Sequence, residues 1–443
     1  MPVPWERESR IHHRNAATPP QHPKGQPARL HYLDWLRVLA ILGVFRFHTT
    51  RPFDLQDFEI KNATRSLAVM ALGLFPFQWG MPLVFLLAGA SSWHALQRRT
   101  SRQYIIDRAR RLMVPYIILG VLTLTPMQVY LGMVHKGEYR GPFLEFGPTY
   151  IASRAGPSWS ELLNPMVFES YGHHLWFLGF LFVYSLIALP IFLWLKKEAG
   201  RRFVVRLGSL VETRGTILVP LIPLVLVRFL LQPLYPGHTD WADFFFMLVF
   251  FISGYVLYAD ERFTRAIRRD WKLVLTLAIA CSVVGYLCYL AGLAETWAYS
   301  PGTVGFYIIW CVLSAVSVCW VIIVLYASMR LLDFRNKWLE YGLDAVMPFY
   351  VFHHPAIIAI AFFVVQWDTS AWLPSTTPFD GLRVQLRAGG ASGGILVKLL
   401  VVALGSFVGS IGLYEVGIRR IGVARALFGM KPLRRQATHW EAE

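Results

Sequence analysis

Charged residues and cysteines are both scarce in this chain of 443 residues. Asp, Glu, Lys and Arg make up 16% of the sequence and hydrophobic residues 55%, whereas soluble domains carry about 25% charged residues. So little charge indicates a membrane protein rather than a soluble one. The four cysteines lie in two apolar segments without the spacing of a disulfide framework or a zinc site, so we interpret them as buried structural thiols: Cys281, Cys288, Cys311 and Cys319.

A signal peptide is also missing from the N-terminal segment. Residues 1–30 are polar and rich in Pro and His, which indicates a disordered cytoplasmic tail. Residues 417–443 form a second, basic tail, and we find no internal repeat or separate soluble domain between the two tails. The expected organisation is a single polytopic membrane domain over residues 31–416 with a tail at each end.

Long apolar runs make up most of that domain. Their lengths predict an all-α integral membrane protein in which about ten transmembrane helices form a single bundle. The first and fifth runs are short for a span, and we expect neighbouring residues to extend them. The runs cover approximately residues 33–49, 67–96, 112–134, 175–195, 216–232, 242–259, 272–292, 303–328, 342–366 and 395–415.

The basic residues predict how this bundle lies in the membrane. Ten spans place both termini on one side, and the tails and loops of that side hold 31 of the 43 Lys and Arg residues, against 8 in the alternate loops. This bias predicts cytoplasmic termini. It also accounts for the net charge of +16. Because the charge is spread over six short loops and tails, we expect anionic lipid rather than nucleic acid as its partner.

The first apolar run carries ionisable side chains along one face. Arg37 and His48 are eleven residues apart, which at ~100° per residue brings the second side chain to within about 20° of the first. Asp34 lies within roughly 60° of that face, and the axial distance from Arg37 to His48 is about 16 Å. Ionisable groups in a bilayer are costly, so this stripe predicts a functional site. The alternative is that the two side chains extend to opposite membrane surfaces.

Further histidines lie in two other runs. His173 and His174 open the fourth run beside Trp176, and His353 lies near the middle of the ninth run, two residues before Pro355. Imidazoles suit proton transfer near neutral pH. The alternatives are interfacial anchoring for the pair and a packed helix kink for His353. No metal-ligand spacing such as H-E-x-x-H occurs, so we predict no metal.

A dense basic segment follows the second run. Arg108, Arg110 and Arg111 carry guanidinium groups of the kind that match phosphate oxygens, although the charge bias of the membrane explains much of this density. Residues 88–92, at the end of the second run, are small, which predicts close helix packing.

Taken together, these segments resemble the family 3 membrane acyltransferases and, within that family, the glucans biosynthesis protein C group, which succinylates periplasmic glucans. Residues 33–37 followed by His48 are similar to the family's opening signature, including its Arg-x10-His spacing. Two departures are Ala88-Gly89-Ala90 in place of Ser-Gly-Phe/Tyr, and Arg46, about 180° from Arg37 on the helix. Further similar segments, in the family's order, are residues 85–89, 108–112, 174–178 and 350–355.

The resemblance implies O-acyl transfer from a cytoplasmic acyl-CoA, acetyl-CoA or succinyl-CoA, to a hydroxyl of an envelope or periplasmic glycan. It implies His48 as the general base and Arg37 as a residue that binds the donor or structures the pore, paired with Asp34. His353 is expected to stabilise the thioester oxyanion or to protonate the thiolate, and an acyl-histidine intermediate is a second route. The residues expected to bind donor or acceptor are Asp34, Arg108, Arg110, Arg111, His174 and Trp176.

Two other classes are weighed against this enzyme. A transporter of protons or of a glycan would also use intramembrane His and Arg residues, but clear inverted-repeat symmetry is lacking. A membrane scaffold gives no reason for the polar stripe. Release of free CoA that depends on acyl-CoA distinguishes the enzyme from the transporter.

Overall fold

The computed structural model describes residues 30–367 and 392–430. Within these ranges the chain is built from helices, turns and loops, without a strand, which agrees with the expected all-α class. The predicted tail over residues 1–30 lies outside the described residues except for Leu30, and residues 431–443 of the predicted C-terminal tail also lie outside them.

Each of the ten predicted apolar runs coincides with helical residues. The first run is extended at both ends, as expected, because its helix covers His31–Thr50. The main helices are α1 (His31–Thr50), α2 (Leu67–Leu96), α3 (Ser101–Arg108), α4 (Thr125–Lys136), α7 (Val167–Gly172), α8 (Trp176–Leu195), α10 (Leu221–Leu231), α11 (Trp241–Leu257), α12 (Glu261–Leu290), α14 (Val304–Leu331), α15 (Lys337–Val364), α17 (Ser392–Leu413) and α18 (Gly422–Leu427).

Seven helices of the described chain are long and apolar enough to cross a membrane. Two further apolar helical segments, 216–231 and Trp241–Leu257, are shorter, and α1 has the length of a span but carries Asp34, Arg37 and Arg46. The chain is therefore a multi-pass membrane protein. The number of ten spans and the side of the termini stay predictions.

The third apolar run forms part of a long helical segment that changes its winding twice. After α3 the backbone passes through π-helical turns at Ala109–Met113 and Tyr116–Leu124 before α4, and it ends at Gly137, which adopts a left-handed φ of 77°. A π-turn shifts the residues that follow it around the helix axis and is frequent at functional sites. The hydrophobic pattern alone gives no sign of this shift.

Helices α2 and α11 touch through their backbones. A Cβ atom added at Gly89 would lie 1.8 Å from the carbonyl oxygen of Phe251, and one added at Gly254 would lie 1.9 Å from that of Leu86. Real Cβ atoms do not come so close, so both positions require glycine. The close helix packing predicted from the small residues 88–92 is confirmed.

The prediction of buried cysteines holds for one of the four. Cys319 is buried, Cys281 and Cys288 are partly exposed, and Cys311 is exposed, so the interpretation is wrong for Cys311. Helix α14, which carries both Cys311 and Cys319, is apolar on all sides, and such a sequence does not reveal which side packs inward.

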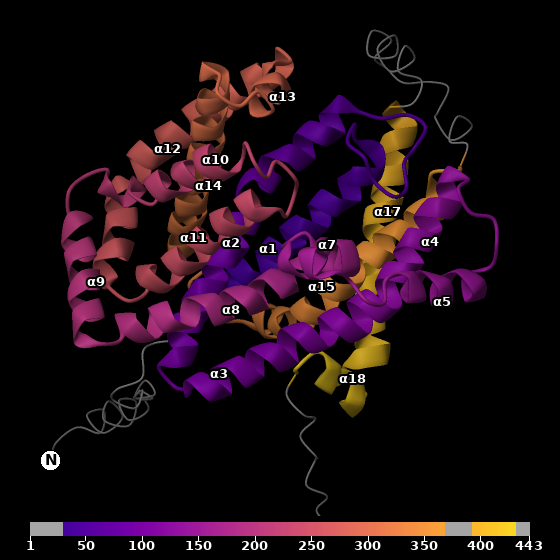
Figure 1. The fold of residues 1–443 in the computed structure, drawn as a ribbon, viewed down its shortest axis with the longest axis horizontal. Coiled ribbons are helices and arrows are strands. Elements are labelled where there is room, and N and C mark those ends of the chain that lie inside the picture. Colours follow the sequence, from indigo (N-terminus) through magenta and orange to yellow (C-terminus); the bar gives the residue numbers. More distant parts are fainter. Residues whose placement is uncertain (1–29, 368–391, 431–443) are drawn as a thin grey trace, which may run out of the picture.

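Helix α1 lies at the centre of the bundle. It packs against α2, α14, α15 and α17, which come from both halves of the chain. Figure 1 shows α15 and α17 on one side of α1 and α2, with α11, α12 and α14 on the other. The ionisable residues of α1 therefore face neighbours that are far away in the sequence.

Candidate active site

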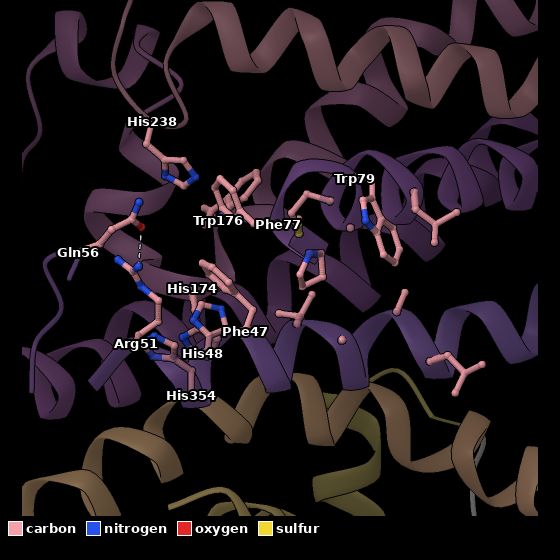
Figure 2. Close-up of a pocket in the computed structure, with 18 of the residues that line it drawn as sticks. Phe47, His48, Arg51, Gln56, Phe77, Trp79, His174, Trp176, His238 and His354 are labelled. Atoms are coloured by element: carbon pink, nitrogen blue, oxygen red, sulfur yellow. Dashed lines mark hydrogen bonds between the residues drawn. The ribbon is translucent and has the colours of Figure 1, made fainter. Parts of the chain in front are cut away.

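A cavity of about 1030 Å³ lies along one side of α1, and we call it the His-lined cavity. Leu36, Ala40, Val44 and His48 contribute successive turns of α1 to its wall, so it extends over most of the helix. The end near His48 is polar and is shown in Figure 2. The ionisable and aromatic residues at that end include Glu59, Glu169, His173, His174, Trp176, His238 and His354.

Four imidazole rings gather at the polar end. The ring centre of His48 lies 4.5 Å from that of His354 and 5.4 Å from that of His353. His174 stacks on His354 at 4.6 Å, with the ring planes 11° apart. These side chains come from α1, from the turn before α8, and from α15. The structure thus brings three predicted residues, His48, His174 and His353, into one cluster, and it adds His354.

The hydrogen bonds of this cluster fix where two of the protons lie. His353 Nδ1 is 2.7 Å from the carbonyl oxygen of Tyr350, and His174 Nε2 is 3.0 Å from that of Val351. A carbonyl oxygen only accepts hydrogen bonds, so each of these nitrogens carries the hydrogen. The other nitrogens, His353 Nε2 and His174 Nδ1, are buried without a partner in the structure, as is His48 Nδ1. In the neutral state, the free nitrogens of His353 and His174 therefore accept protons rather than donate them.

Two acid–histidine pairs stand beside the cluster. Glu59 Oε1 lies 3.0 Å from His173 Nε2, and Glu169 Oε1 lies 3.0 Å from His238 Nδ1. Burial alone raises the pKa of Glu59, but the hydrogen bond and charge of His173 outweigh it and hold that pKa below its usual value. Loss of solvent lowers the pKa of His238, but the hydrogen bond and charge of Glu169 outweigh that effect and raise this pKa above its usual value.

The backbone is strained at two points near these pairs. His173 has a φ of 51° and Thr239 a φ of 58°, in the left-handed region that residues other than glycine rarely adopt. The Thr239 hydroxyl donates to Glu169 Oε2 at 2.7 Å, which ties the loop before α11 to α7. Such strain persists only where surrounding contacts enforce it, and it clusters at functional sites.

A second cavity of about 680 Å³, the Arg-lined cavity, borders the neighbouring side of α1. Its basic residues are Arg37, Arg99, Arg108 and Arg111. Three acidic residues, Asp107, Glu340 and Asp344, also line it. Of the three predicted arginines that follow α2, Arg108 and Arg111 thus face this cavity together with Arg37. Arg110 is exposed and does not line it.

Arg37 links α1 to α2. Its Nη1 donates to Asp34 Oδ1 at 2.6 Å and its Nη2 to the hydroxyl of Ser91 at 2.7 Å. The pairing of Arg37 with Asp34 that the sequence suggested is therefore present. One residue further along α2, the hydroxyl of Ser92 accepts a hydrogen bond from Arg108 at 3.0 Å. The two arginines are thus held at adjacent positions of one helix.

The two cavities share their walls. On α1, Arg37 and Ile41 face the Arg-lined cavity, whereas His48 faces the His-lined one. Tyr350 lines the Arg-lined cavity, and its hydroxyl donates at 2.7 Å to the carbonyl oxygen of His174, which lines the other cavity. Arg37 and His48 therefore reach different cavities, although their spacing predicts a common face.

Two further intramembrane charges form a separate pair. Arg228 Nη1 lies 2.8 Å from Asp243 Oδ1, and the guanidinium lies over the rings of Phe246 and Trp310. Neither Arg228 nor Asp243 lines either cavity. In the described ranges, no three His, Cys, Asp or Glu side chains are grouped as ligands for one metal ion.

Comparison with known proteins shows which family the chain belongs to. A family model described as an acyltransferase domain, that of the family 3 acyltransferases, matches residues 30–415. The chain belongs to this family. The acyltransferase is 23% identical to the glucans biosynthesis protein C of Escherichia coli (strain K12) over 360 residues, which are 78% of this chain and 86% of that protein. The same figures hold for the glucans biosynthesis protein C of Escherichia coli O157:H7. No solved structure matches the chain.

Several residues at the polar end of the His-lined cavity cannot be identified from the sequence alone. The sequence does not single out His354, yet His354 lines the His-lined cavity and His353 does not. Neighbouring residues of a helix point about 100° apart, so a His-His pair signals that one of the two faces the cavity without telling which. Glu59, Glu169 and His238 lie far apart in the sequence, and no spacing indicates that they meet.

Proposed function

We propose that this acyltransferase moves an acetyl or succinyl group from acyl-CoA to a hydroxyl of an envelope glycan, in the bacterial inner membrane. The observation that carries the proposal is the pair of adjoining cavities, one basic and one rich in imidazole. A donor with phosphate groups and an acceptor with a reactive hydroxyl need different surroundings, and the two cavities supply them on either side of one wall.

The Arg-lined cavity suits the donor. Guanidinium groups bind phosphate oxygens through paired hydrogen bonds, and Arg108 and Arg111 face this cavity. Arg99 also lines it and pairs with Asp107 at 2.7 Å. The charge bias of the loops supports a cytoplasmic position for this side, where acyl-CoA is made. From there the pantetheine arm would pass Arg37 and Ile41 toward Tyr350, which separates this cavity from the imidazole cluster.

The polar end of the His-lined cavity suits a glycan acceptor. The rings of Phe77 and Trp176 offer surfaces against which the apolar face of a sugar packs. Glu59 and Glu169 offer carboxylate oxygens that accept hydrogen bonds from hydroxyl groups, and Glu59 Oε2 is buried without a partner in the structure. The likeness to proteins named for glucan biosynthesis supports a glycan of this kind.

His48 is the general base of the proposed reaction. It removes the proton of the acceptor hydroxyl, and the oxygen attacks the thioester carbon. The carbon–sulfur bond breaks, and the thiolate takes up the proton that His48 holds, so the products are the ester and free CoA. General acid–base catalysis of this type contributes about 10²–10⁴-fold. The Nδ1–H of His353 is engaged by Tyr350, so we assign His353 a supporting position behind His48 rather than the role of oxyanion donor.

The test combines thiol release with glycan mass. Purified protein in detergent is given acetyl-CoA or succinyl-CoA with and without glucan, and free CoA and glucan mass are measured. We expect acceptor-dependent CoA release and a matching mass increment, both reduced about 10²–10⁴-fold in His48→Ala. The matched control is His94→Ala, since His94 lies in α2 and lines neither cavity.

Three outcomes contradict parts of the proposal. Full activity of His48→Ala refutes the role of His48 as general base but is compatible with acyltransferase activity. Release of CoA without a mass increment on the acceptor refutes the glycan as the acceptor. An unchanged glycan mass with altered glycan abundance outside the cell favours the transporter.

A further inference from the structure

The fully buried side-chain amide of Gln128, in α4, contacts one histidine of the imidazole cluster from outside the cavity. Gln128 has no exposed surface. Its Nε2 donates to the carbonyl oxygen of Leu124 at 3.1 Å, and its Oε1 lies 2.6 Å from His354 Nδ1. Leu124 is the last residue of the π-helical turns Tyr116–Leu124, so the amide sits just after the point where the winding of this helical segment changes.

The orientation of this amide determines the proton position of His354. The carbonyl oxygen of Leu124 only accepts hydrogen bonds, so the NH₂ group of Gln128 must face it and the amide oxygen must face His354. An amide oxygen in turn only accepts, so His354 Nδ1 carries the hydrogen. His354 Nε2 is then the nitrogen with the free lone pair.

That lone pair belongs to the ring nearest to the proposed base. His354 lines the His-lined cavity, and its ring centre lies 4.5 Å from that of His48 in an edge-to-face contact. A catalytic histidine is usually oriented by a carboxylate. The cavity's two glutamates, Glu59 and Glu169, instead pair with His173 and His238.

We propose that Gln128 and His354 are positioning residues that together replace this carboxylate. Gln128 keeps the proton of His354 on Nδ1, and His354 Nε2 accepts an N–H of His48 once His48 has taken the hydroxyl proton. The imidazolium is thereby oriented and stabilised until the thiolate removes the proton. The hydroxyl proton ends on the thiol of free CoA, and His48 and His354 return to their neutral states. This inference rests on the proposed function of His48.

The experiment is a double-mutant cycle in the acyl-CoA assay. Gln128→Met keeps the volume of the side chain and removes the acceptor, and we expect kcat to fall about 10-fold, the worth of one neutral hydrogen bond, with the KM of both substrates unchanged. Gln128→Glu retains an oxygen acceptor and recovers most of the lost kcat. In a His354→Asn background, Gln128→Met costs nothing more, because its effect passes through His354.

The control is Thr125→Val on the same helix. Thr125 is 1% exposed and its hydroxyl has no partner in the structure, so removing it changes the packing of α4 as little as Gln128→Met does. We expect an unchanged kcat. A kcat of Gln128→Met equal to that of the wild type, or equal losses with and without His354, overturns the proposal.

A second readout does not depend on activity. Imidazole ¹⁵N NMR of histidine-labelled protein, with the His354 signals identified by their loss in His354→Asn, reports which nitrogen carries the hydrogen. We expect hydrogen on Nδ1 in the wild type and its loss or redistribution in Gln128→Met. Hydrogen on Nε2 in the wild type overturns the inference. If the wild type releases no CoA yet shows hydrogen on Nδ1, the proposed function fails and the positioning geometry stands.

Discussion

Replacing Arg37 with methionine separates its structural contribution from its proposed contribution to donor binding. Its guanidinium bridges Asp34 at 2.6 Å and Ser91 at 2.7 Å, and the Asp34 side chain is only 6% exposed. Removing the cation leaves a buried carboxylate without its nearest positive charge. Breaking a fully buried ion pair in this way costs about 3–5 kcal/mol, whereas removing both charges is often close to neutral. The cost here is smaller, because the Arg37 side chain is 35% exposed.

We therefore expect Arg37→Met to lower the free energy of unfolding by about 2–3 kcal/mol, which is below the range for a fully buried pair. We expect Asp34→Asn combined with Arg37→Met to recover most of that loss. The assay is reversible unfolding in mixed detergent, followed by tryptophan fluorescence. Arg37 also lines the Arg-lined cavity, so the double variant is stable but keeps a raised KM for acyl-CoA.

Two results would refute this reasoning. If Arg37→Met stays within about 1 kcal/mol of the wild type, the Asp34 carboxylate does not depend on Arg37. If the double variant regains both stability and a normal KM, Arg37 is a purely structural residue and the donor binds elsewhere.

Two more predictions concern packing and pH. Gly89→Ala places a methyl group 1.8 Å from the carbonyl oxygen of Phe251, so we expect a loss of stability at or above the upper end of about 1–3 kcal/mol. Gly409→Ala meets open space and serves as the control; a melting temperature of Gly89→Ala equal to that of Gly409→Ala would contradict the close contact. For His238, Glu169 raises the folded-state pKa above its usual value of 6.5, so this pair stabilises fully below about pH 6.5 and its contribution is lost as the pH rises through the folded-state pKa. The melting temperature of the wild type is expected to exceed that of His238→Gln at low pH, and the difference is expected to vanish at alkaline pH. A difference that grows with pH would contradict the expected direction of this pH dependence.

The sequence predicts the helices well and their arrangement poorly. The run 67–96 was predicted with the bounds that α2 has, because apolar composition alone marks such a helix. Which side of an apolar helix faces inward is a property of its neighbours, and Cys311 illustrates this. The π-helical turns before α4 leave no periodic signal either, yet Gln128 follows directly after them.

For the candidate site, the predictable part is what one helix determines by itself. The Asp34–Arg37 pair lies within one turn of α1, and its contact follows from helix geometry. The separation of Arg37 and His48 into two cavities does not follow, since it depends on how α2 and α15 pack against α1. The same reason explains why Arg110 points away from a cavity that Arg108 and Arg111 line.

The placement of α1 between the two cavities makes its length a strict requirement. One extra residue between Arg37 and His48 would turn one end of the helix by about 100° and advance it by ~1.5 Å relative to the other. If Arg37 kept its place, His48 would rotate away from His354. If His48 kept its place, Arg37 would rotate away from the Arg-lined cavity. Substitutions of the intervening residues leave this register unchanged. A single insertion or deletion there would uncouple Arg37, on the proposed donor side, from His48, on the proposed acceptor side, without removing either side chain.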